Sequence, residues 1–154
     1  MAKPLLTSLA LLVYSTLTTA QTPLPPALYV DAEDIATALA QAASERPAMA
    51  VSTITTTEQY RINLIRRTEA AGAIIHEVGT ELHYITEGAG TLVTGGTVVR
   101  PTDGGRPTIE GGLARQVTAG DAILIPEGTP HWYSAVDGSV TYLEVRFNVP
   151  VPAQ

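Results

Sequence analysis

From Met49 onward, β-branched or apolar residues alternate with polar ones, and Gly or Pro marks the breaks between runs. A period of two residues predicts strands with one buried face. So many short strands in about 100 residues favour a sandwich or a barrel, and the fold class is therefore predicted to be all-β. The expected strands lie near residues 51–57, 59–67, 71–77, 81–86, 90–100, 113–118, 121–125, 131–135 and 139–147.

Residues 101–112 (PTDGGRPTIEGG) form the one long irregular stretch between the expected strands. Loops of this length are uncommon in compact domains and often cover functional sites. We therefore expect this loop to shape the mouth of any cavity in the domain.

The first twenty residues have the composition of a secretory signal peptide, expected over residues 1–20. Lys3 gives a positive start, residues 5–17 are largely apolar, and small residues follow. The apolar run is short for a membrane span. These features predict a secreted or periplasmic protein with no membrane contact after signal removal, and a cytoplasmic one if the N-terminus is retained.

Residues 21–48 are expected to hold a linker and one helix. Three Pro within residues 21–27 predict an extended linker. The apolar spacing that follows predicts a helix over about residues 32–45, capped by Asp31 and lying outside the β domain. That domain is expected over residues 49–150, and a chain of 154 residues is long enough for one globular core.

Composition excludes several classes of function. The formal net charge is −6, and a chain this acidic does not gather phosphate backbones, so no nucleic acid partner is expected. The chain has no Cys, and no Lys beyond residue 20, which removes thiol, thiolate-ligand, disulfide and Schiff-base chemistry. Carboxylates, three His, six Tyr and the Arg residues remain for function.

Two of the three His lie near a tight turn that also carries a Glu. If residues 77–80 form a four-residue hairpin loop, His76 and Glu81 face each other with Cβ atoms ~5 Å apart. An imidazole and a carboxylate at that separation can share one metal ion. In the same register His83 lies opposite Ile74 and on the same face.

The third His follows a sharp reversal of the chain. A short apolar strand runs into Pro126, Gly128 and Pro130, which turn the backbone before His131. That turn fixes the position of one imidazole. All three His, together with Glu81, could therefore line one cavity.

These two stretches resemble the two motifs of the cupin superfamily. The second motif (Gly, five residues, Pro-x-Gly, two residues, His) is matched in spacing by Gly120, Pro126, Gly128 and His131. The end of the first motif (His, four residues, Glu, six residues, Gly) is matched by His76, Glu81 and Gly88. The resemblance covers about residues 50–147. It implies a single cupin jelly-roll barrel, with the metal site inside and one N-terminal helix before it.

The sequence departs from the cupin motifs at three positions. The first His of the family's His-x-His pair falls on Ile74, the opening Gly of the first motif on Thr68, and the closing Asn of the second on Ala135. Since Ile cannot ligate a metal, the family's full ligand set is incomplete in this chain.

The remaining ligand candidates are His76, Glu81 and His131. Two imidazoles with one carboxylate are the usual arrangement for non-haem Fe(II) chemistry. His83 could also supply the missing imidazole, or serve as a pocket-wall or acid–base residue. The resemblance therefore implies a divalent metal ion as cofactor, with Fe expected first and Mn, Ni or Zn as alternatives.

Three functions fit such a site. The first is a metal-dependent enzyme acting on a small organic molecule, expected to be an Fe(II)-type dioxygenase. The second is a metal-assisted isomerase, cyclase or lyase, in which His83 acts as general acid or base. The third is a non-catalytic protein whose barrel binds a metal or a small ligand.

Two Tyr and several Arg residues flank these candidates. Tyr133 shares the face of His131 and either positions a substrate or fills the barrel, whereas Tyr84 points away from the cavity. Arg61 and Arg146 are expected either to clamp a carboxylate or to pair with Glu144. By contrast, Arg66 and Arg67 are expected to form a solvated strand end.

The expected strand 51–57 is a plausible sheet edge. An exposed edge strand presents unpaired backbone groups that favour a partner strand. A homodimer is therefore expected.

Overall fold

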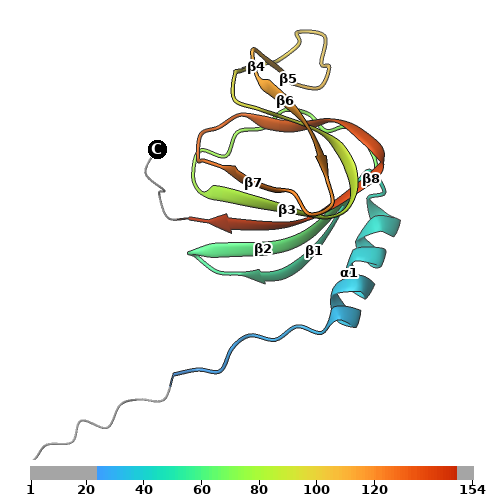
Figure 1. Cartoon of the computed structure of the whole chain (residues 1–154), viewed down its shortest axis with the longest axis vertical. Helices are drawn as coiled ribbons and strands as arrows, with labels where there is room; N and C mark the ends of the chain where they lie inside the picture. The colour runs from blue at the N-terminus through green and yellow to red at the C-terminus, as the bar shows by residue number, and fades with distance from the viewer. Residues whose placement is uncertain (1–23, 149–154) are drawn as a thin grey trace, which may run out of the picture.

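The computed structural model describes residues 24–148 (Figure 1). They form the helix α1 (Ala32–Glu45), followed by the strands β1 (Met49–Thr56), β2 (Tyr60–Arg67), β3 (Thr80–Thr94), β4 (Thr97–Val99), β5 (Thr108–Glu110), β6 (Leu113–Thr118), β7 (Ala122–Ile125) and β8 (His131–Phe147). The expected signal peptide lies outside the described residues. Within residues 24–148, no helix is long and apolar enough to cross a membrane.

The expected helix is confirmed. Asp31 has an extended backbone, and its carboxylate accepts a hydrogen bond of 2.8 Å from the backbone N–H of Glu33. This cap satisfies one of the free N–H groups of the first turn. The helix lies on the outside of the sheet, against β1 and β2 (Figure 1).

The barrel is built around two long strands. The sheet order is β1-β2-β8-β3-β6, with β7 also paired to β3. The expected strands near 81–86 and 90–100 are one strand as far as Thr94, and those near 131–135 and 139–147 are also one strand. Register shifts between β3 and β8 bend both strands without ending them. Gly88 and Gly138, which in the sequence pattern mark the end of one strand and the start of the next, lie beside these shifts.

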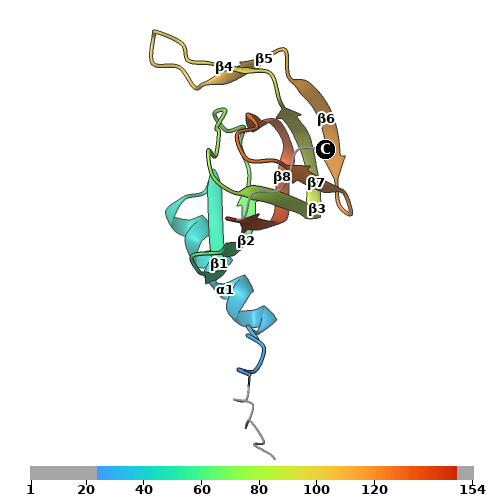
Figure 2. The ribbon, with the colours of Figure 1, turned by 90° about the vertical axis from the view of Figure 1, so that its left-hand side faces the viewer.

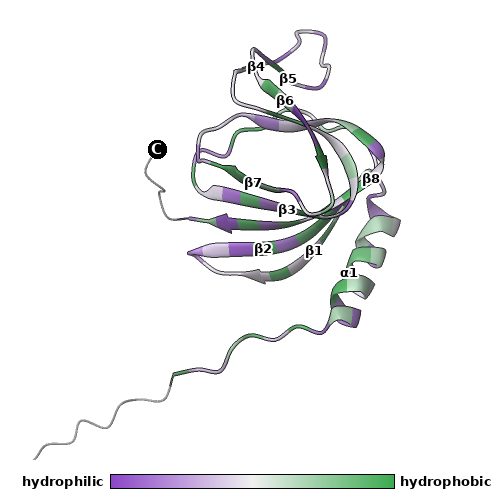
Figure 3. Ribbon diagram, in the orientation of Figure 1, coloured by the Kyte–Doolittle hydropathy of each residue, from purple (hydrophilic) through white to green (hydrophobic). Residues whose placement is uncertain are grey.

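Side chains on the inner face form a compact core. Figure 3 shows apolar and polar residues alternating along the strands, as the sequence pattern predicts. The core residues are Ile65, Ile85, Leu92, Val117, Ile125, Tyr133, Val140 and Tyr142. The predicted all-β jelly-roll barrel with one N-terminal helix is therefore confirmed, and β1 lies at one end of its sheet.

The strand expected near 71–77 is not present. Only an isolated bridge between Ile74 and His131 is found there. The proposed hairpin cannot form because both edges of β3 are occupied, one by β8 and the other by β7. Residues 71–79 instead form a loop beside the start of β8.

The stretch 101–112 also differs from the prediction. It contains β5, which pairs with β4 in a hairpin that projects from the barrel (Figure 2). The backbone N–H of Ala73 donates to the carbonyl of Pro107 at 2.8 Å, so this stretch contacts the 71–79 loop. None of residues 101–112 lines the two cavities at the candidate site, which corrects the expectation that they shape its mouth.

Candidate metal centre

His131 is held by backbone contacts at the start of β8. Its N–H and carbonyl both bond Ile74, each at 3.0 Å, and its ring Nδ1 lies 3.0 Å from the carbonyl oxygen of Thr129. A carbonyl oxygen can only accept, so Nδ1 carries the proton and donates it. The lone pair of His131 is therefore on Nε2, which lies 3.5 Å from Glu81 Oε2.

His76 reaches the same place from the 71–79 loop. The backbone N–H of Gly128 donates to the carbonyl of His76 at 2.8 Å, which joins this loop to the turn before β8. Nη2 of Arg146 lies 2.8 Å from His76 Nε2. A guanidinium only donates, so the lone pair of His76 is also on Nε2, 3.1 Å from Glu81 Oε1.

Glu81 joins these groups from β3. Its side chain is buried, with 2% of the residue exposed. Besides the two imidazoles, its Oε1 lies 2.8 Å from Nη2 of Arg146, which also lies 3.7 Å from Glu144 Oε1. Arg146 is thus the cation at this carboxylate, whereas the two imidazoles face it with their lone pairs.

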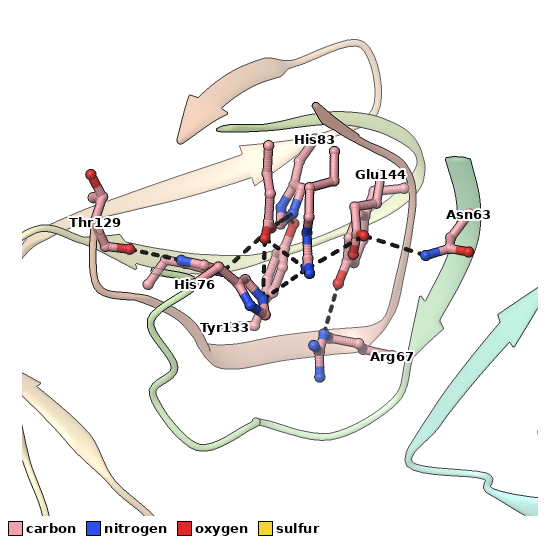
Figure 4. Close-up of polar contacts among 11 residues, drawn as sticks. Asn63, Arg67, His76, His83, Thr129, Tyr133 and Glu144 are labelled. Carbon is pink, nitrogen blue, oxygen red and sulfur yellow. Dashed lines mark hydrogen bonds and ion pairs between the residues drawn. The ribbon is translucent and has the colours of Figure 1, made fainter. Parts of the chain in front are cut away.

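His83, which is labelled in Figure 4, reaches the same carboxylate from β3. Its Nε2 is 3.1 Å from Glu81 Oε2, and its Nδ1 is 3.4 Å from the hydroxyl of Tyr133. An ionised carboxylate only accepts, so Nε2 carries the proton and Nδ1 accepts from Tyr133. Both ring nitrogens of His83 are therefore engaged by protein groups.

The residues present fit a divalent metal ion. Ligand atoms about 2.1 Å from one ion, at right or tetrahedral angles, lie roughly 3.0 to 3.4 Å apart. His76 Nε2 lies 3.1 Å from Glu81 Oε1, within this range, and His131 Nε2 lies 3.5 Å from the other oxygen, Oε2, just beyond it. A small cavity of about 30 Å³ adjoins the three side chains. An ion held there would replace the contact of Arg146 with His76 and Glu81.

A second group of candidate ligands shares the same carboxylate. Ligand atoms of Glu81, His83 and Glu144 lie within 4.8 Å of one another, as do those of His76, Glu81 and His131. The hydrogen bonds distinguish the two groups. In the group with Glu144, His83 presents a proton to Glu81, whereas His76 and His131 both present a lone pair.

Two predictions about these residues are wrong, one about a strand pairing and one about exposure to solvent. His83 does not lie opposite Ile74, because β3 pairs with β8 and β7, so His83 pairs with Glu144 and Ile123. The second wrong prediction is that Arg67 lies in solvent at a strand end. It lines the site, and its Nε donates to the hydroxyl of Tyr142 at 3.0 Å.

Alternation along β2 could have revealed this inward face. Arg61, Asn63, Ile65 and Arg67 are two residues apart, so their side chains share one side. All four line a cavity next to the site. Asn63 Nδ2 donates to Glu144 at 3.3 Å, a contact with no separate sequence signal.

Two other expectations are confirmed. Tyr84 points outward and is 44% exposed, and Arg146 contacts Glu144.

The pKa shifts suit metal binding at neutral pH. Burial lowers the pKa of His76 and of His131 below the ordinary 6.5, although the Glu81 carboxylate opposes this. For Glu81, burial raises the pKa, but the His83 hydrogen bond and the charges of His131 and Arg146 outweigh it and lower the pKa to about 2. Neutral imidazoles and an ionised carboxylate are the forms that bind metals.

We expect the metal-free protein to lose stability in acid. The unfolded imidazoles take up protons near pH 6.5, whereas His76 and His131 in the folded state do so only at lower pH. The free energy of unfolding should therefore fall as the pH drops below about 6.5, and Glu81 should add a loss between about pH 4.5 and 2. Urea unfolding at a series of pH values across these intervals measures the loss of stability.

The variant His131→Gln tests whether His131 contributes to this pH dependence of stability. Without the imidazole, the fall below about pH 6.5 should be shallower than in the wild type. An equal slope in both proteins would contradict the assignment of the loss to His131.

Comparison with protein-family models gives one match. Residues 72–151 match the model described as AraC-like ligand binding domain. The chain belongs to the AraC-like ligand-binding domain family. This cupin match begins four residues before His76 and includes the other three candidates, Glu81, His83 and His131. No curated protein sequence matches this AraC-like domain.

Solved structures show the same fold. KdgF from Halomonas sp. is 16% identical, with a TM-score of 0.52 over 68% of this chain and 83% of its own. A predicted oxalate decarboxylase from Thermotoga maritima is 16% identical, with a TM-score of 0.50 over 66% of this chain and 81% of its own.

The iron-containing protein FeII HppE is also similar. It is 16% identical, with a TM-score of 0.53 over 65% of this chain and 51% of its own. The match therefore spans about half the length of that protein. At these identities the three likenesses show the cupin fold alone.

Proposed function

We propose that this protein is a metal-dependent cupin enzyme that acts on a small organic molecule as an Fe(II)-type dioxygenase. The observation that carries the proposal is the convergence of two imidazole lone pairs and one carboxylate on a small cavity. We assign His76, Glu81 and His131 as the ligands. When bound, Fe(II) would supply coordination positions for a substrate and dioxygen.

In this proposal His83 is a positioning residue for Glu81. Its Nε2–H donates to the carboxylate, and Tyr133 fixes the ring by donating to Nδ1. Burial raises the pKa of Tyr133, so its hydroxyl keeps the proton needed for this bond. The pair thus holds one orientation of Glu81 and keeps it ionised.

We expect His83→Gln to weaken metal binding without changing its stoichiometry. Loss of a residue that orients a ligand typically costs about 10- to 100-fold in metal affinity. Co(II) titration should therefore still reach one ion per chain in His83→Gln, whereas His131→Ala should retain none. If His83→Gln also retains none, then His83 is itself a ligand. If His131→Ala keeps the ion while His83→Gln loses it, then the group with Glu144 binds the ion.

Oxygen uptake tests the reaction class. Protein reconstituted with Fe(II) under argon would be mixed with a panel of small organic molecules, both acids and neutral compounds, and dioxygen consumption measured with an electrode. We expect uptake with at least one of them, and none with His131→Ala. Turnover in the absence of dioxygen would rule out the dioxygenase and favour the isomerase, cyclase or lyase alternative.

A second candidate function is ligand binding without catalysis. The family match favours it, since the matched model describes a ligand binding domain. A stoichiometric metal with ligand binding, but without turnover under either atmosphere, would support this alternative. Export and homodimer formation through β1, the strand at the end of the sheet, are further proposals.

A further inference from the structure

A second, larger cavity adjoins the metal centre. Its volume is about 400 Å³, which is within the range of small-molecule sites. It shares six lining residues with the small cavity, namely Arg67, Ala71, Gly72, Ile74, His76 and Glu144. A molecule in the large cavity would therefore lie directly beside the candidate ligands.

The lining of the large cavity has more cationic than anionic side chains, although the protein as a whole is acidic. Three guanidinium groups line it, from Arg61, Arg67 and Arg146, against one carboxylate, that of Glu144. The chain as a whole has a formal net charge of −6. Positive charge is therefore gathered at this cavity, and a lining with excess cationic groups attracts an anion.

Two of these cations have no carboxylate partner. Arg146 contacts Glu81 and Glu144, but within residues 24–148 neither Arg61 nor Arg67 forms an ion pair. The carboxylate of Glu144 is already shared between Asn63 and Arg146. An unpaired guanidinium beside a cavity is a ready site for an anion.

Arg67 is held in place by two aromatic residues. Its Nε donates to the hydroxyl of Tyr142, and its guanidinium carbon lies 5.6 Å from the centre of the Tyr133 ring. Burial raises the pKa of Tyr142 to about 12, so the hydroxyl is neutral and does not compensate the charge. Figure 4 shows Arg67 pointing toward the site. Its terminal amino groups have no hydrogen-bond partner among the described residues.

We propose that the large cavity binds a small organic acid whose carboxylate is held by Arg67. A guanidinium binds a carboxylate through two parallel N–H donors, and this gives both affinity and orientation. Apolar side chains of Met49, Val51 and Ile65 line the same cavity and suit an apolar body. The inference names the substrate class of the metal site and so rests on the proposed function.

Matched acids and amides test this inference. Hexanoate and benzoate, with hexanamide and benzamide as neutral counterparts, would be titrated by calorimetry into the full chain after metal removal with EDTA. We expect each acid to bind at least about tenfold more tightly than its amide, since charge-assisted hydrogen bonds are the stronger kind.

Arg67→Gln should remove this preference, and Arg66→Gln is its control. Arg66 is the next residue on β2, is exposed and lines neither cavity, so its replacement should leave the binding of both acids unchanged. Arg67→Lys keeps the charge without the planar fork and should give an intermediate affinity. Circular dichroism checks that each variant is folded.

The outcomes separate this inference from the proposed function. Equal binding of acid and amide, no binding of either acid, or wild-type affinity in both Arg67 variants would overturn the acid-binding site. Co(II) titration of the same preparation tests the metal centre independently. If Co(II) binds but the acids bind no better than their amides, the metal centre stands and the proposed substrate class is wrong. If the acids are preferred but Co(II) does not bind, the acid-binding site stands and the metal centre is wrong.

Discussion

Glu81→Gln is expected to abolish metal binding while the barrel stays folded. Both candidate ligand groups contain Glu81, so the loss is expected whichever group binds the ion. A neutral amide is a poor ligand beside two imidazoles, and the affinity should fall by more than about 100-fold, beyond the loss caused by an orienting residue. Metal analysis of protein purified without added ions, followed by Co(II) titration, measures it.

Glu87→Gln is the matched control for this change. Glu87 lies on the same strand, six residues further along, and is exposed. The substitution removes the same charge at a position away from the candidate ligands, so metal content should equal that of the wild type. If Glu81→Gln retains Co(II) with the affinity of Glu87→Gln, then Glu81 is not a ligand and the proposed centre is wrong.

Gly88→Ala is expected to cause the largest loss of stability. Gly88 has φ +72°, and a Cβ built there would overlap the carbonyl oxygen of Ser139. The left-handed backbone costs an L-residue about 1–2 kcal/mol, and overpacking adds about 1–3 kcal/mol. The free energy of unfolding, measured in urea, should therefore fall by about 3 kcal/mol or more.

Gly138→Ala separates the two contributions. Gly138 has φ +73°, almost the same as Gly88, but a Cβ there would meet nothing within 4 Å. It should therefore show the backbone cost alone, about 1–2 kcal/mol. Equal losses at the two positions would mean that the Ser139 contact contributes nothing and that only the backbone conformation matters.

Gly88 also explains why part of the fold could be predicted from the sequence. The first motif, whose spacing identified His76 and Glu81, ends at this Gly, which allows β3 to approach the carbonyl of Ser139 closely. His131 was identified by the second motif. Such spacings record local chain geometry, so they carried over to the structure. The helix over 32–45, with its Asp31 cap, was equally local and was predicted correctly.

The pairing of distant segments could not be read from the sequence. A period of two residues describes the faces of a strand but not its neighbours, and so the hairpin proposed around residues 77–80 was wrong. His76 is placed by the bridge between Ile74 and His131, which are far apart in the chain. For the same reason Arg67, at a strand end, was expected in solvent although β8 lies beside it.

The three proposed ligands belong to separate segments, because His76 lies on the 71–79 loop, Glu81 on β3 and His131 on β8. An ion that they share would cross-link the 71–79 loop, which is not part of the sheet, to β3 and β8, which already pair with each other. By mass action, a free ion at 100 times its dissociation constant adds about 2.7 kcal/mol to the stability of the folded state. The supply of metal would then set how long the protein survives, as well as whether its site is complete.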